Sequence, residues 1–191
     1  RSHRTGVEWR LNATELRLRS EPPWDWGPRT LHVAHFLVAE VLSLLSIRWP
    51  VPRWWADTFV EWRTLTNGLP VGGANLLNVA TRLGVPAMDS DYKTAIRDVL
   101  IRGDRSEIES KLPMIIEYCA EDVRVTQQVF SRLASDRRFD LPRALLRGRA
   151  MVLTALMQWR GIPVDAPLLR RMVEQWDDIK SALIIDCPGY L

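Results

Sequence analysis

The sequence predicts an α/β fold, because two short apolar strand candidates each run into a helix and a long amphipathic helix follows. The first strand candidate covers residues 31–35 and leads into a helix over roughly 37–47. The second covers residues 54–57 and leads into a helix over roughly 59–66. Residues 112–133 sort into an apolar and a polar arc at about 100° per residue, which is typical of a helix packed on a core.

The start of the chain predicts a β-hairpin over residues 1–20, with alternating segments at 7–11 and 15–18. A hairpin needs a third strand or a helix to be stable, so we expect further sequence upstream. Residues 21–29 are rich in proline and glycine and predict a loop. Four tryptophans are expected to pack a core rather than to stack on bases: Trp49, Trp54, Trp55 and Trp62.

After residue 70 the pattern becomes mainly helical. A helix over residues 75–83 has Gly84 as its C-terminal cap, and another over 90–102 ends at Gly103. Ser106 and Glu109 have the spacing of a capping box. Pro113 should kink the helix or mark the start of a new one, and the long helix then runs to about residue 134.

The composition changes near Phe139–Asp140, which predicts two domains, residues 1–139 and residues 140–191. Pro142 is expected at the start of the next helix. Asp165 is expected to cap a last helix from about residue 166 to residue 185.

The composition narrows the class of protein but does not identify its function. The hydrophobic fraction of 47% and the charged fraction of 26% are those of a soluble globular protein. A net charge of +3 permits a nucleic-acid partner but does not demand one. We expect neither a signal peptide nor a membrane span, because charged and polar residues interrupt the apolar run from residue 31 to 47. Cys119 falls on the apolar arc and is interpreted as a small buried side chain in a reducing compartment.

Two acids stand out because their surroundings are apolar. Asp122 is the one charge inside the apolar arc of residues 112–133, and Tyr118 lies one turn earlier on the same face. Glu40 is the only acid between residues 31 and 52. A carboxylate removed from water must protonate, pair with a cationic side chain or bind a metal ion. Each acid alone is more often a satisfied core residue, whereas together they suggest a shared hard cation such as Mg²⁺.

A basic stretch surrounds Pro142 and has five members: Arg137, Arg138, Arg143, Arg147 and Arg149. A solvated helix face is the favoured interpretation of such a stretch. Contact of Arg143, Arg147 and Arg149 with DNA is the alternative.

Several segments resemble motifs of one protein family, and they follow one another in the same order as in that family. Residues 118–122 resemble the Y-x-x-x-D third motif of DEDD-type 3′→5′ proofreading exonucleases. Residues 31–40, 49–52, 57–63 and 66–70 resemble the exonuclease region of phage-type, polymerase I-like family A DNA polymerases. Three later segments resemble the passage from that exonuclease into the polymerase thumb: residues 141–149, 161–165 and 176–180.

The resemblance implies a ribonuclease-H-like α/β exonuclease fold that lacks its first strand, over residues 1–139, followed by the helical start of the thumb, over 140–191. It implies hydrolysis of DNA 3′ ends with two metal ions, Mg²⁺ or Mn²⁺. Asp122 would be a metal ligand and Tyr118 would orient the attacking water. Glu40 occupies the second-motif position, where the family has Asp. The first motif, Asp-x-Glu, has no match. Asp57 is interpreted first as a helix cap and second as a site residue.

The implied protein is a fragment of a family A DNA polymerase, acting on single-stranded 3′ ends and primer–template DNA together with the remainder of the polymerase chain. We expect it in the cytoplasm of a bacterial or phage-infected cell. Because the metal site would be incomplete, we expect little or no nuclease activity from this chain as it stands. The alternative is a non-catalytic scaffold that supports the polymerase and binds DNA through its arginines. A stand-alone exonuclease is disfavoured by the thumb-like segment.

Overall fold

A computed structural model describes residues 1–67, 69, 72–87 and 90–187, with the side chains of residues 90–94 left out of the description. The chain forms two compact units, Arg1–Trp159 and Arg160–Leu191. The division therefore falls between residues 159 and 160, later than the compositional boundary expected at 139/140. Helix α8 (Leu141–Arg160) begins beyond the compositional boundary, yet nearly all of it belongs to the first unit.

The described residues form a mixed α/β structure that is mostly helical. Strands β1 (Leu31–Ala34) and β2 (Trp54–Asp57) pair in parallel, with Leu31 opposite Trp54 and Ala34 opposite Asp57. Helix α2 (Leu37–Ser46) connects them. Both predicted strands and the helix between them are confirmed. Within the described part of the chain, no helix has the length and apolar character needed to cross a membrane.

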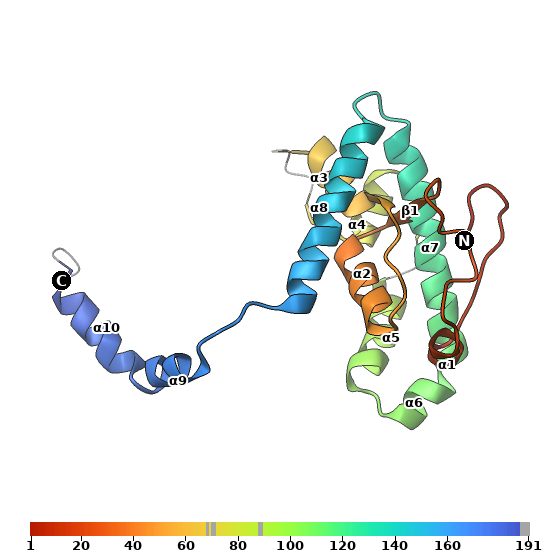
Figure 1. Ribbon diagram of the computed structural model, residues 1–191. Coiled ribbons are helices and arrows are strands. Elements are labelled where there is room, and N and C mark those ends of the chain that lie inside the picture. Colours follow the sequence, from red (N-terminus) through yellow and green to blue (C-terminus); the bar gives the residue numbers. More distant parts are fainter. Residues whose placement is uncertain (68, 70–71, 88–89, 188–191) are drawn as a thin grey trace. The chain divides into compact units, whose positions relative to one another are not determined.

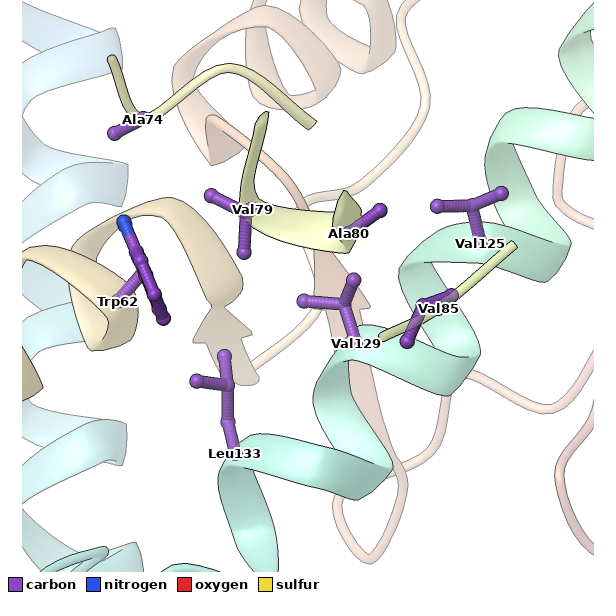
Figure 2. Close-up of a cluster of buried hydrophobic side chains, with 8 residues drawn as sticks. All are labelled: Trp62, Ala74, Val79, Ala80, Val85, Val125, Val129 and Leu133. Carbon is purple, nitrogen blue, oxygen red and sulfur yellow. The ribbon is translucent and has the colours of Figure 1, made fainter. Parts of the chain in front are cut away.

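The first core cluster joins three helices of this unit. Helices α3 (Thr58–Leu65), α4 (Leu76–Arg82) and α7 (Leu112–Ala134) direct apolar side chains toward one another. Figure 2 shows Trp62 of α3 facing Val79 of α4, with the α7 residues Val129 and Leu133 beside them. In Figure 1, α7 is the long green helix. The predicted span of this helix, to about residue 134, is confirmed.

The second core cluster packs α2 and α8 against the sheet. Ala34, Leu37 and Val41 are buried with Trp55 and with Ala155 of α8. Gly148 allows the close approach of α8, because a Cβ at that position would overlap the carbonyl oxygen of Trp55. The expectation of core packing is confirmed for three of the four tryptophans, with exposed fractions of 3% for Trp49, 5% for Trp55 and 7% for Trp62.

The predicted N-terminal hairpin is wrong. Residues 13–18 form helix α1 (Ala13–Leu18), and residues 1–20 contain no strand. A capping box explains the helix, because Asn12 accepts a hydrogen bond from the backbone N–H of Glu15 while the Glu15 carboxylate accepts one from Asn12. This local signal outweighs the weak alternation of residues 15–18.

Two other helix boundaries differ from the prediction. Helix α5 (Ser90–Arg102) is as expected, but α6 (Arg105–Ser110) is capped by Asp104 rather than by Ser106. The last predicted helix is two helices, α9 (Ala166–Glu174) and α10 (Trp176–Ile185), separated at Gln175. Asp165 does cap α9, as expected, by accepting a hydrogen bond from the backbone N–H of Leu168 at 2.9 Å.

The buried face of α7 is rotated from the predicted arc. Cys119 is exposed, so its interpretation as a buried side chain is wrong, and Val123 is 44% exposed. Ala120, the next residue along the helix, is buried instead. The buried residues of this helix are Ile115, Ala120, Val125, Val129 and Leu133.

Candidate functional site

Tyr118 and Asp122 form a pair on α7. Both are partly buried, and the Tyr118 hydroxyl donates a hydrogen bond to the Asp122 carboxylate. Burial, followed by the negative charge of Asp122 and this hydrogen bond, raises the pKa of Tyr118 to about 12. Although Cys119 as a residue is exposed, partial desolvation of its thiol, followed by the charge of Asp122, raises the pKa of that thiol. Tyr118 therefore stays protonated at neutral pH and can donate its hydroxyl hydrogen to Asp122.

Arg124, two residues after Asp122, is engaged with other acids. Its guanidinium lies 2.7 Å from Glu121, 3.0 Å from Glu117 and 3.6 Å from Glu8. Arg10 also contacts Glu117, at 2.6 Å. This network joins residues 8–10 to the solvent-facing side of α7.

Glu40 lies on the first turn of α2 and lines a cavity of about 340 Å³. Burial, followed by the like charge of Asp57, raises the pKa of Glu40 to about 7 against a usual value of 4.5, while its own backbone N–H opposes the shift. The residue as a whole is nevertheless exposed, so the burial that raises this pKa is only partial. His32 lines the same cavity and was not singled out from the sequence, since a lone histidine in an apolar strand carries no distinctive signal.

Asp57 fixes the position of α2 relative to α3. The residue is 1% exposed, and its carboxylate accepts hydrogen bonds from the backbone N–H groups of Phe36, Leu37 and Phe59, at 3.0, 2.9 and 3.0 Å. Phe36 has no side-chain cap and a φ of 69°, a conformation that is costly for a bulky residue. One carboxylate thus caps two helices, which agrees with its interpretation as a structural cap.

Glu40 and Asp122 have separate neighbours. The charge acting on Glu40 is that of Asp57, whereas Asp122 acts on Tyr118 and Cys119. Across residues 1–67, 69, 72–87 and 90–187, no group of three or more His, Cys, Asp or Glu side chains is placed to hold a metal ion. A hard divalent cation takes six or more oxygen ligands, several of which can be water or substrate oxygens. The described side chains alone do not fit such a site.

The three candidate DNA-contacting arginines differ in availability. Arg147 binds the buried Glu61 through two hydrogen bonds, of 2.8 and 2.6 Å, so its guanidinium has a structural role. Arg143 is exposed and lies 3.5 Å from Asp140. Arg149 is exposed. Glu61 was missed from the sequence, because nothing local shows that it is buried.

A model of the family described as DNA mitochondrial polymerase exonuclease domain matches residues 74–136. This segment covers α4 to α7 and contains Tyr118 and Asp122, while Glu40 lies outside it. No curated protein and no solved structure matches the chain. The family match supports a DNA polymerase exonuclease domain over this segment, of the mitochondrial polymerase type.

Proposed function

We propose that this chain is part of the 3′→5′ exonuclease region of a family A DNA polymerase and serves in the handling of DNA 3′ ends. The observation that carries the proposal is the family match over residues 74–136, which includes the hydrogen-bonded pair Tyr118–Asp122. The strand–helix–strand unit of β1, α2 and β2 is compatible with a ribonuclease-H-like core. Residues 140–191 would then lead toward the thumb.

In this proposal Asp122 and Glu40 are the carboxylates available to Mg²⁺ or Mn²⁺, and Tyr118 donates a hydrogen bond to Asp122. Because the described side chains do not complete that site, the chain by itself hydrolyses DNA 3′ ends weakly or not at all. Its specific contribution is to bind a single-stranded 3′ end.

Two measurements test this function. The first is binding of labelled single-stranded DNA, with linear and circular single-stranded DNA as competitors. A 3′-end-binding chain is displaced more readily by the linear competitor, and equal competition contradicts the proposal. The second is nucleotide release with Mg²⁺ or Mn²⁺, comparing the wild type with Asp122→Asn and with the exposed control Glu109→Gln. Robust release that is lost only in Asp122→Asn would support the site and contradict weak activity.

A second candidate is a non-catalytic scaffold that binds DNA, favoured by the separate neighbours of Glu40 and Asp122. In this case Arg143 and Arg149 contribute to affinity, whereas Arg147 acts through folding. The double variant Arg143→Ala/Arg149→Ala would then bind DNA more weakly. The slope of log affinity against log salt concentration would become shallower, by the equivalent of about two phosphate contacts. Equal competition by linear and circular DNA would favour this candidate over the first.

A further inference from the structure

Helix α8 has apolar residues on two opposite sides. The inner side holds its buried residues, Ala144, Gly148 and Ala155. The outer side carries an apolar stripe, defined as Leu146, Leu153 and Met157, whose members are between 60% and 69% exposed. Residues spaced by seven and four positions lie on one side of a helix, so the three form a continuous row. A helix that is apolar on both sides is normally covered on both sides, so the stripe requires a partner.

Arginines border this stripe on both edges. Helix α8 contains four arginines and no acidic residue. Arg143 and Arg149 stand three residues before and after Leu146, which places them about 60° to either side of it on the helix. Arg149 is exposed and forms no ion pair within the described part of the chain, and Arg143 is exposed beside Asp140. A second copy of α8 laid on this stripe would bring like charges together, so the fitting partner is an apolar helix with acidic edges.

Helix α10 has that character. Trp176 and Leu183 are seven residues apart on one side of the helix, and each is at least half exposed. Asp186, at the C-cap, is exposed and stands about 60° from Leu183. Asp177 is 92% exposed at its side chain, although Lys180 lies 2.8 Å from it. Residues 176–186 hold three aspartates against this one lysine, so α10 is an acidic amphipathic helix.

Helix α9 is a poorer match for the stripe of α8. It also exposes apolar side chains, among them Leu168 and Val173. Its charged residues, however, are two arginines and one glutamate. Contact with the arginine-bordered stripe would therefore be weakened by repulsion, whereas contact with α10 would be strengthened by attraction.

We propose that the apolar stripe of α8 binds helix α10 of a second copy of this chain. The seven-residue spacing of Leu146 and Leu153 equals that of Trp176 and Leu183, so the two rows can interdigitate as they do in paired helices. Removal of these exposed side chains from water supplies the affinity. The arginine edges of one helix and the aspartate edges of the other set the choice of partner. This inference does not rest on the proposed exonuclease function.

The test is sedimentation equilibrium of the full chain over a series of concentrations. We expect self-association that weakens as salt is added, because the charges at the edges are exposed. Leu153→Asp should weaken self-association at least about tenfold, since a leucine buried on association is replaced by a charge. The matched control is Gln158→Asp, which adds the same charge at an exposed position of α8 outside the stripe and should leave self-association unchanged.

A mixing experiment identifies the two surfaces. Leu183→Asp disrupts α10, as Leu153→Asp disrupts α8, and each variant alone should remain monomeric. An equimolar mixture with one variant fluorescently labelled should associate, because one variant keeps an intact α8 and the other an intact α10. Both leucines are exposed, so neither substitution removes a core contact, and circular dichroism checks that both variants are folded.

Three outcomes would overturn the proposal. One is a wild-type chain that stays monomeric up to about 1 mM. Another is undiminished self-association of either single variant, which would show pairing of α8 with α8 or of α10 with α10. The third is a mixture of the two folded variants that does not associate.

Discussion

Arg147 of α8 donates two hydrogen bonds to Glu61 of α3, through Nε to Oε1 at 2.8 Å and through Nη2 to Oε2 at 2.6 Å. The Glu61 side chain is only 1% exposed, whereas that of Arg147 is 27% exposed. The two residues are 86 positions apart. The pair therefore joins the helix that follows β2 to the helix that follows α7, and the guanidinium satisfies an otherwise isolated buried carboxylate.

Arg147→Ala should destabilise the protein by about 3–5 kcal/mol, because it leaves the Glu61 charge buried without a partner. Urea unfolding measures the change in the free energy of unfolding. The control is Arg143→Ala on the same helix, whose pair with Asp140 is exposed and should be worth less than about 1 kcal/mol. Similar losses in both variants would show that solvent compensates Glu61 and would contradict the structural role of Arg147.

Gly148→Ala should destabilise the protein by about 1–3 kcal/mol, although alanine is normally the better helix former. The added Cβ would meet the backbone carbonyl of Trp55, which cannot rotate away as a flexible side chain can. Thermal unfolding measures the effect. The matched control is Ala150→Leu, an exposed position two residues later on α8. Stabilisation in Gly148→Ala would mean that α8 does not approach β2 this closely.

Local patterns predicted the local parts of this fold. Residues 54–56 are a short aromatic and apolar run that ends at the helix-capping Asp57, and residues 54–57 form the strand expected. Helix α7 ends at the point in the sequence where apolar residues stop recurring at helical spacing. The hairpin prediction failed because alternation over four residues is a weaker signal than a capping box that satisfies two backbone N–H groups.

Local sequence patterns could not predict burial and contacts that depend on residues far apart in the chain. Burial of Ala120 in place of Cys119 depends on how α7 rotates against its neighbours, and alanine gives little hydropathic signal. Nothing in the order of residues says which of many arginines reaches Glu61. The same limit applies to Glu40 and Asp122, since apolar surroundings identified both acids but could not show that Asp57, rather than Asp122, acts on Glu40.

Asp57→Asn should cost about 2–3 kcal/mol, since the buried carboxylate accepts hydrogen bonds from three backbone N–H groups on two helices. The amide has one carbonyl oxygen and turns its NH₂ toward a donor. The control is Asp104→Asn at the exposed start of α6, a single cap for which at most about 1 kcal/mol is expected. Chemical denaturation compares the two variants. Equal costs would show that α2 does not depend on Asp57 for its N-terminal cap.

Substitution of Asp57 should also change the titration of Glu40. Because the negative charge of Asp57 contributes to the raised pKa of Glu40, its removal in Asp57→Asn should lower that pKa toward its usual value. The side-chain carboxyl ¹³C chemical shift of Glu40, followed against pH, reports the change directly. A pKa of Glu40 that does not move in a folded Asp57→Asn variant would mean that burial alone causes the shift.

Glu40 should make the protein less stable as pH rises from about 4.5 to about 7. Its pKa in the folded state is about 7 against a usual 4.5, so the folded state holds the proton more tightly than the unfolded state. Below that window both states are protonated, and the contribution to stability is absent. Above it both are ionised, and the penalty is constant. Contact of Glu40 with solvent keeps the penalty smaller than full burial would make it.

Other groups titrate differently, so a comparison of variants isolates Glu40. The lowered pKa of His32 acts with the opposite sign, because the unfolded state takes up the proton first as pH falls. The pKa of Asp136, lowered to about 2 by Arg138, acts only in more acidic solution. Both contributions are common to the wild type and Glu40→Gln. The variant should therefore gain stability relative to the wild type between about pH 5 and about pH 8, measured by urea unfolding at each pH. A constant difference would mean that Glu40 ionises in the folded protein as it does in the unfolded chain.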